Sequence, residues 1–278
     1  MNGLCAIFGA ALSWWSACAA PHPGEFDPTR LGYAETTAGR SLVSEAIGKA
    51  NIIVDKDERL ALVAGWEQSA WTADSVPVHL IVGGSSNEMI FVPKGCRCVV
   101  ITVLVMQTWL AEASDPAKAD LAVDGVSILV FMMLHELGHI ACGDEGVVAF
   151  APLPKNASDT NLVRNDEKRR EFAADAWAAD HVRRAFTAGH PGFFASMNVQ
   201  FALTAVGWNL ARRRMIDNFG ASVLRDPRVF FDQGYTHPNF ELRMLVANEL
   251  VSGTPAAKAL RQEFESMREK GDDLRCPV

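Results

Sequence analysis

Residues 121–142 read LAVDGVSILVFMMLHELGHIAC, and this stretch is the most informative part of the 278-residue chain. Its first fourteen residues hold a single charge, Asp124. A segment that is apolar nearly all round predicts a helix buried in a core. His135, Glu136 and His139 follow without a break, where polar groups are costly unless they are paired or bind a metal ion.

The two histidines lie four residues apart, so on a helix they share one face, one turn apart. This spacing lets both imidazoles bind one tetrahedral metal ion, of which zinc is the usual occupant. Glu136 would then lie beside the metal, where a general base for the activated water is needed. The alternative is two core histidines satisfied by hydrogen bonds, which leaves Glu136 unexplained.

A second acidic pair follows in the sequence EFAAD, residues 171–175. On a helix Glu171 and Asp175 share one face. Glu171 as third ligand would leave one position open for water, as in catalytic zinc sites. Asp175 would accept the other ring N–H of a zinc-binding histidine. The alternative for Glu171 is a solvated charged face.

The flanks of this second helix are less informative. Asn165 is a suitable N-cap, which predicts a helix near residues 165–187. Asp180 and His181 do not keep the four-residue spacing from Glu171, so we interpret them as surface residues.

A third segment near the C-terminus reads YTHPNFELR, residues 235–243. Pro238 suits the first turn of a helix. Tyr235 or His237 could donate to a developing oxyanion, and His237 could also approach the metal. Arg243 could hold the site carboxylates or bind substrate. Taken alone, the segment is equally ordinary for the start of a helix.

HELGH, EFAAD and THP followed by an arginine, in this order, are similar to the gluzincin metallopeptidases. Within that group the pattern resembles the Lit-type phage-exclusion peptidases and, more distantly, HtpX-like ones. The resemblance implies an α+β, helix-dominated, zincin-like fold with a small sheet beside the metal helix. It implies a site in which zinc is bound by His135, His139 and Glu171, with Glu136 as base and with Asp175, His237 and Arg243 nearby. Lit-type enzymes cleave a translation elongation factor, so a host translation factor is a candidate substrate.

We expect one domain over residues 1–278, with a catalytic core over 87–250 and a less defined part over 1–85. By analogy with the family, the sheet edge within residues 78–92 would bind an extended peptide by strand addition. In the first part of the chain we expect a helix over 41–50, two short strands within 51–63, and strands at 78–84 and 89–95. A further strand from Cys96 should run into a helix that ends at Ala113. Helices are then expected near 165–187, 195–216, 237–252 and 255–270.

Composition narrows the class of protein. The formal net charge is −7, which argues against a general nucleic-acid surface. The six cysteines have no zinc-ribbon spacing, and we expect mostly reduced thiols, Cys96 and Cys98 included. Cys142 is interpreted as a small buried core residue rather than a ligand.

The expected location is the cytoplasm, because the scattered cysteines suit a reducing compartment. Stable membrane insertion is not expected, because no apolar run reaches the length of a spanning helix. Residues 4–20 resemble a secretory signal, which leaves a secreted or periplasmic protein as the alternative. No basic residue precedes that run.

The sequence therefore predicts a zinc metalloendopeptidase that acts on a protein or peptide substrate. Cobalt or manganese would also suit two histidines and a glutamate. The metzincin pattern is absent, because Cys142 and Glu145 stand where it requires glycine and histidine. The alternative function is a zinc-bearing regulator or sensor of the ImmA-like type, with gated or lost hydrolysis.

Overall fold

The computed structural model describes residues 34–54, 60–83, 88–93, 96–113, 121–143, 160–220 and 240–270. Within these ranges, seven α-helices accompany one four-stranded sheet, which confirms the helix-dominated α+β class. The helices are α1 (Arg40–Ile53), α2 (Val103–Ala113), α3 (Gly125–Ala141), α4 (Thr160–Ala185), α5 (Phe193–Gly220), α6 (Phe240–Ser252) and α7 (Pro255–Lys270). The strands are β1 (Ala61–Ala64), β2 (Ser75–Ile81), β3 (Ile90–Phe91) and β4 (Val99–Thr102), and a short 3-10 turn spans Gln68–Ala70.

The sheet has the strand order β1-β2-β4-β3. β1 and β4 run parallel to β2, whereas β3 is antiparallel to β4 and pairs Ile90 with Ile101. Every residue of β2 is buried, because its apolar run suits a central strand covered on both faces. The expected edge within residues 78–92 is therefore correct only for β3, and β2 lies inside the sheet.

Helix α3, which carries the HELGH motif, lies at the centre of the described structure, between α1 on one side and α4 and α5 on the other. It begins at its N-cap Asp124, whose side chain accepts hydrogen bonds from the backbone of Val126 and from the hydroxyl of Ser127. Phe131 and Leu134 are fully buried. The apolar residues before the histidines thus form the core that the sequence predicted.

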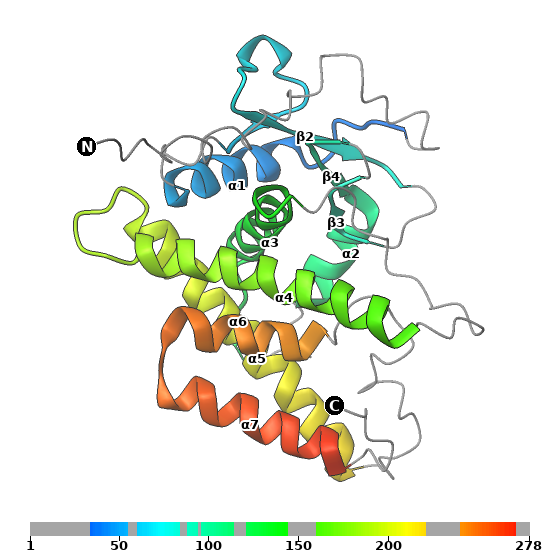
Figure 1. Ribbon diagram of the computed structural model, residues 1–278, viewed down its shortest axis with the longest axis vertical. Coiled ribbons are helices and arrows are strands. Elements are labelled where there is room, and N and C mark those ends of the chain that lie inside the picture. Colours follow the sequence, from blue (N-terminus) through cyan, green and yellow to red (C-terminus); the bar gives the residue numbers. More distant parts are fainter. Residues whose placement is uncertain are drawn as a thin grey trace, which may run out of the picture.

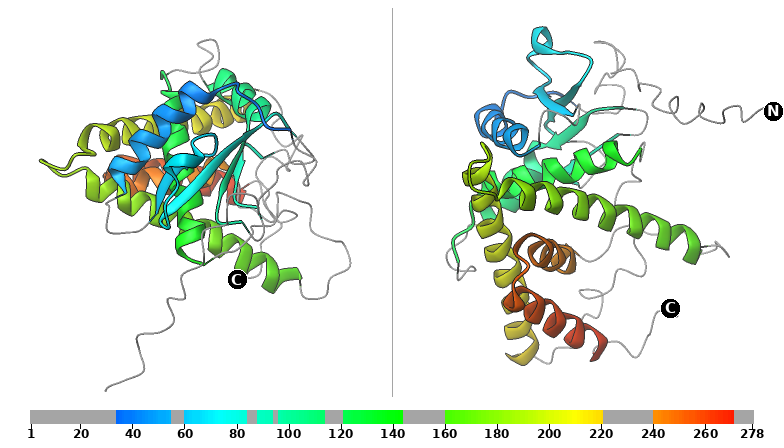
Figure 2. Two further views of the ribbon diagram at one scale, coloured as in Figure 1. Left: turned by 90° about the horizontal axis from the view of Figure 1, so that it is seen from above. Right: turned by 60° about the vertical axis from the view of Figure 1, so that its left-hand side comes forward.

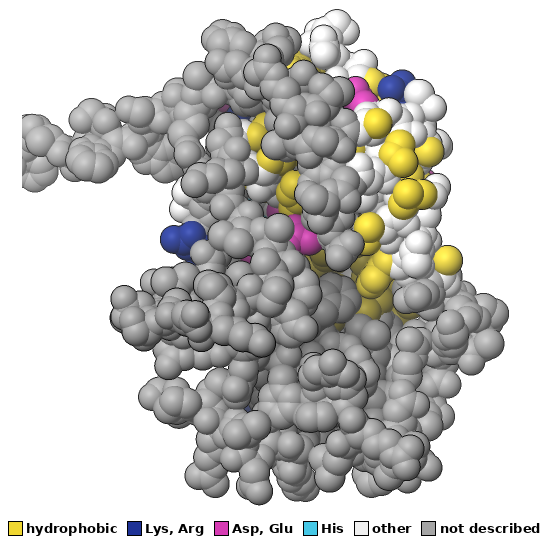
Figure 3. All heavy atoms as spheres, turned by 90° about the vertical axis from the view of Figure 1, so that its right-hand side faces the viewer, with side chains coloured by type: hydrophobic (Ala, Val, Ile, Leu, Met, Phe, Trp, Pro, Cys, Tyr) yellow, Lys and Arg dark blue, Asp and Glu magenta, His cyan; other side chains and the backbone are white. Residues whose placement is uncertain are grey.

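The remaining helices are arranged as successive layers away from the sheet. α4 crosses α3, α6 packs on α4, and α7 packs on α6, while α5 contacts α3, α6 and α7 (Figure 1). On the face at the right of Figure 1, hydrophobic side chains gather at the sheet end of the described surface, and acidic side chains come to the surface near the middle (Figure 3).

Several local expectations are wrong. Residues 51–53 continue α1 rather than form a strand, because Val43, Ile47, Ala50 and Ile53 extend one buried helical face. Cys96 and Cys98 form a disulfide. They lie before β4 with Cα atoms 5.2 Å apart, closer than the roughly 6.6 Å of alternate residues in an extended strand.

One residue at the end of α3 and one residue of α4 are also placed differently from expectation. Cys142 is exposed, because α3 ends at Ala141 and Cys142 is its C-cap. His181 is buried and packs on Trp177, since it shares the apolar face of α4 with Ala174 and Ala178. No helix among the described residues combines the length and the apolar composition required to cross a bilayer.

Candidate metal centre

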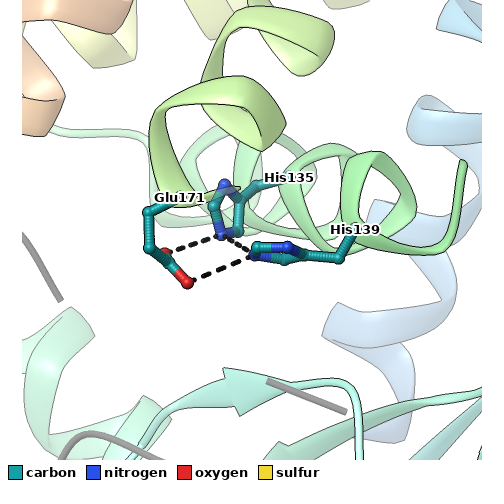
Figure 4. Close-up of side chains that lie close together, drawn as sticks. All are labelled: His135, His139 and Glu171. Atoms are coloured by element: carbon teal, nitrogen blue, oxygen red, sulfur yellow. Dashed lines mark hydrogen bonds and ion pairs between the residues drawn. The ribbon is translucent and has the colours of Figure 1, made fainter. Parts of the chain in front are cut away.

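α3 brings the two imidazoles of the HELGH motif together (Figure 4). His135 and His139 are 3% and 1% exposed, and their Nε2 atoms are 3.0 Å apart. The rings are nearly perpendicular, with centroids 4.6 Å apart. Both Nε2 atoms thus lie at the side of α3 that faces α4.

Glu171 of α4 completes the group. Its carboxylate oxygens lie 3.4 Å from His135 Nε2 and 3.4 Å from His139 Nε2. Two atoms that each lie about 2.05 Å from a tetrahedral ion are roughly 3.3 Å apart. The three side chains are therefore spaced as ligands of one ion, and they are buried, with all candidate ligand atoms within 4.8 Å of one another.

A close contact between the two helices makes this geometry possible. A Cβ atom at Gly138 would lie 3.0 Å from the backbone of Ala174. Gly138, between the two histidines, therefore lets α4 approach α3 closely enough for Glu171 to reach the imidazoles. Gly138 was not among the predicted site residues, although a glycine inside an apolar helix is a signal of close backbone approach.

Asp175, one turn after Glu171, orients the first histidine. His135 Nδ1 lies 2.8 Å from Asp175 Oδ1. An Nδ1–H donated to this carboxylate leaves the lone pair on Nε2, which is the tautomer that can bind a metal ion. Burial opposes ionisation of Asp175, yet Arg243 and His135 lower its pKa to about 2.

Arg243 of α6 connects both carboxylates. Its Nε and Nη2 atoms donate to the two oxygens of Asp175 at 2.8 and 2.9 Å, and its Nη1 lies 2.8 Å from Glu171 Oε2. Nη2 is also 3.1 Å from His135 Nε2. Burial disfavours the guanidinium charge, but Asp175 and Glu171 outweigh it and raise the pKa of Arg243.

Glu136 lies beside the ligands without taking part in their contacts to α4. It is 4% exposed, and its Oε1 is 4.0 Å from His135 Nε2. Burial raises the pKa of Glu136 to about 7, against the lowering effect of the two histidines and with the repulsion of Glu171 and Glu88. Glu88, just before β3, was not predicted. An acidic residue at the start of an edge strand gives no signal in the sequence alone.

The charged neighbours of His135 change its pKa in opposite directions. Burial and the positive charge of Arg243 lower the pKa, but the carboxylates of Asp175 and Glu171 outweigh both effects and raise the pKa to about 10.

A count of formal charges tests whether a metal ion fits. Without a metal ion, the raised pKa values of His135 and Glu136 let protons offset part of the negative charge. With the histidines neutral and Glu136 ionised, as metal binding requires, Glu136, Glu171 and Asp175 contribute −3 and Arg243 contributes +1, so the buried group carries −2. A buried net charge is costly. One divalent cation among the two Nε2 atoms and Glu171 would neutralise it, and this donor set suits zinc and other divalent transition metals. The group can therefore hold a metal ion.

The structure thus brings together six of the eight expected site residues: His135, Glu136, His139, Glu171, Asp175 and Arg243. The other two, Tyr235 and His237, lie outside the described residues. Asp180 pairs with Arg183 and Arg184 at the surface, as expected. Helix α4 begins at Thr160, before the expected N-cap at Asn165.

No family model matches the chain, and no curated protein and no solved structure is significantly similar to it.

Proposed function

We propose that the protein is a zinc-dependent endopeptidase of zincin-like fold. The observation that supports this best is the buried group of His135, His139 and Glu171 with Glu136 beside it. Three protein ligands leave a tetrahedral ion one free position, which distinguishes catalytic from closed structural zinc sites. When bound, zinc lowers the pKa of a water molecule and polarises a carbonyl oxygen.

Each protein side chain then has a defined part. Glu136 accepts the proton of the attacking water and passes it to the leaving amide nitrogen. Its Oε1 lies 4.0 Å from His135 Nε2, so Glu136 is beside the atoms that would hold the ion. Asp175 holds the tautomer of His135, and Arg243 keeps both α4 carboxylates in place. Tyr235 or His237 would donate to the developing oxyanion.

The substrate in this proposal is a segment of a protein chain. β3 is one of the two edge strands of the sheet, and it contacts α3, the helix that holds the histidines. An extended peptide added to this edge would lie alongside the metal helix. The resemblance to Lit-type peptidases makes a host translation factor the first substrate to test.

The test combines metal analysis with cleavage. The purified chain, zinc-loaded, is incubated with candidate protein substrates, and new termini are mapped by mass spectrometry. We expect wild-type protein to bind one zinc and to cleave, and Glu136→Gln to keep zinc but lose cleavage by a factor of at least about 100. Cleavage unchanged in Glu136→Gln would contradict the assigned base.

The third ligand has a matched control on the same helix. Glu171→Ala should lose zinc, whereas Asp180→Ala, a surface acid, should retain it. Equal zinc content in both variants would rule out Glu171 as ligand. Zinc binding with no cleavage of any substrate would favour a regulatory metal site of the ImmA-like kind.

A further inference from the structure

The outer face of α5 has a composition unusual for a solvent-exposed helix. Residues 193–209 contain no Asp, Glu, Lys or Arg. Four residues of this segment are exposed, and three of them are aromatic: Phe194 at 70%, Phe201 at 65% and Trp208 at 42%. The fourth is Thr204. A surface helix normally turns charged residues to solvent, so this face is suited to covering by another apolar surface.

The three aromatic residues recur every seven residues. On an α-helix this spacing places them along one face at intervals of about 10.5 Å. Phe193 packs edge-on against Phe194 and stacks on Phe186, which extends the aromatic surface at the start of the helix. In the right-hand view of Figure 2, α5 (yellow) runs down one side of the molecule.

A hollow of about 190 Å³ lies next to the middle aromatic residue. It is lined by Ala122, Asp124, Asn198, Phe201 and Ala202. Leu121, itself 42% exposed, is joined to α5 by two hydrogen bonds: its N–H donates to Asn209 Oδ1, and Asn209 Nδ2 donates to its carbonyl oxygen. The exposed apolar surface therefore extends from α5 to the segment that precedes α3.

We propose that this face of α5 is the interface with a second copy of the chain. The aromatic residues are symmetric about Phe201, with one seven residues before it and one seven after. An antiparallel pairing of two α5 helices, with the two-fold axis at Phe201, stacks Phe201 on Phe201 of the partner subunit. The same pairing places Phe194 opposite Trp208 of the partner subunit. A two-fold interface requires such self-complementarity.

The three aromatic residues supply a little under half of the area that a standard interface buries on each partner. A fully buried aromatic side chain covers roughly 150–250 Å², so the exposed fractions of the three residues leave roughly 350 Å² of aromatic surface per copy. A standard interface buries about 800 Å² per partner. Further contact area comes from residues around the three aromatic side chains, namely Thr204, the half-buried Met197 and Asn198, and Leu121. With no charge over residues 193–209, that segment can pair with itself without repulsion.

The test is the oligomeric state of the full chain, measured by sedimentation velocity and light scattering up to about 100 μM, well above the Kd of a micromolar dimer. We expect wild-type protein to be dimeric, and Phe201→Glu and Phe201→Lys each to weaken the dimer at least about 30-fold. Because Phe201 lies on the axis, an equimolar mixture of the two variants should restore a dimer. Leu104→Glu, at a 57% exposed site on α2, is the control that should stay dimeric.

This inference does not depend on the metal site, so zinc content and melting temperature are measured on the same samples. Both should match wild-type protein in the Phe201 variants, which separates a lost interface from a lost fold. A wild-type monomer at the highest concentration would overturn the proposal, as would a dimer that persists in Phe201→Glu. Failure of the mixture to restore a dimer would overturn the two-fold pairing at Phe201, whereas a wild-type monomer would leave another protein or a membrane as the occupant of this face.

Discussion

Replacing Arg243 by methionine, a side chain of similar length, should destabilise the metal-free protein by about 3–5 kcal/mol. The guanidinium is 6% exposed and makes two hydrogen bonds to Asp175 and one ion pair to Glu171. Its removal leaves two buried carboxylates without this cation, and breaking a buried pair from one side costs more than exchanging the whole pair for apolar groups. For a chain of this size the loss corresponds to a melting temperature lower by about 6–10 °C.

Thermal and urea unfolding of the metal-free and zinc-loaded protein measure this effect. Arg243→Lys is the matched control. It keeps the charge but not the planar fork that binds Asp175 through two nitrogens, so it should lose less stability than Arg243→Met. The double variant Arg243→Met, Asp175→Asn should recover part of the loss, since one of the two uncompensated charges is gone. A loss below about 1 kcal/mol in metal-free Arg243→Met would refute the reasoning, because it would mean that the carboxylates do not depend on the guanidinium.

Three further changes test other parts of the structure. Gly138→Ala places a methyl group 3.0 Å from the backbone of Ala174, so it should weaken zinc binding in a zinc titration and lower stability in a urea melt. The control is Gly48→Ala, which has open space around it and should stabilise the protein by up to about 1 kcal/mol. Asp175→Asn should weaken zinc binding by about 10–100-fold in a competition titration with a chelator, since His135 loses its orienting carboxylate. Burial lowers the pKa of His79 from 6.5 to about 4. Between these pH values the unfolded chain binds more protons than the folded one, so the free energy of unfolding decreases as the pH falls, by up to about 3 kcal/mol. Urea melts at pH 7 and near pH 4 should therefore show a smaller loss of stability in His79→Gln than in wild-type protein.

The part of the site that could be predicted from the sequence is the part set by helical spacing. His135 and His139 on one helix, and Glu171 and Asp175 on another, needed only the four-residue repeat to be placed on common faces. The helix positions from α2 to α7 followed from hydrophobic periodicity in the same way, with boundaries shifted by a few residues. Such features depend on neighbours close in sequence.

The features that could not be predicted depend on contacts between distant segments. Arg243 was a candidate to hold the site carboxylates, but its hydrogen bonds to Asp175, 68 positions away, follow from no local pattern in α6, and binding of substrate was an equal alternative. β2 was expected at an edge by analogy with the family, and a short apolar run does not itself reveal how many strands flank it. His181 was expected at the surface because its spacing was compared with Glu171 alone, whereas the apolar face of α4, which includes Ala178 and Val182, determines its burial.

The charges of the site explain why it lies where three helices meet. α3 supplies the imidazoles, α4 the two outer carboxylates and α6 the guanidinium, so each helix brings a group that would be costly to bury alone. Together with Glu136 of α3 these groups carry −2 when the histidines are neutral, and a cation that completes the set would join α3 to α4 directly and would act on α6 through Arg243. Metal binding is then linked to the packing of all three helices, because the bound ion stabilises the folded arrangement and not the separated segments. The apolar residues of α3 before His135 pack in the core and hold the two histidines in position. α4 and α6 supply the charged groups that surround them.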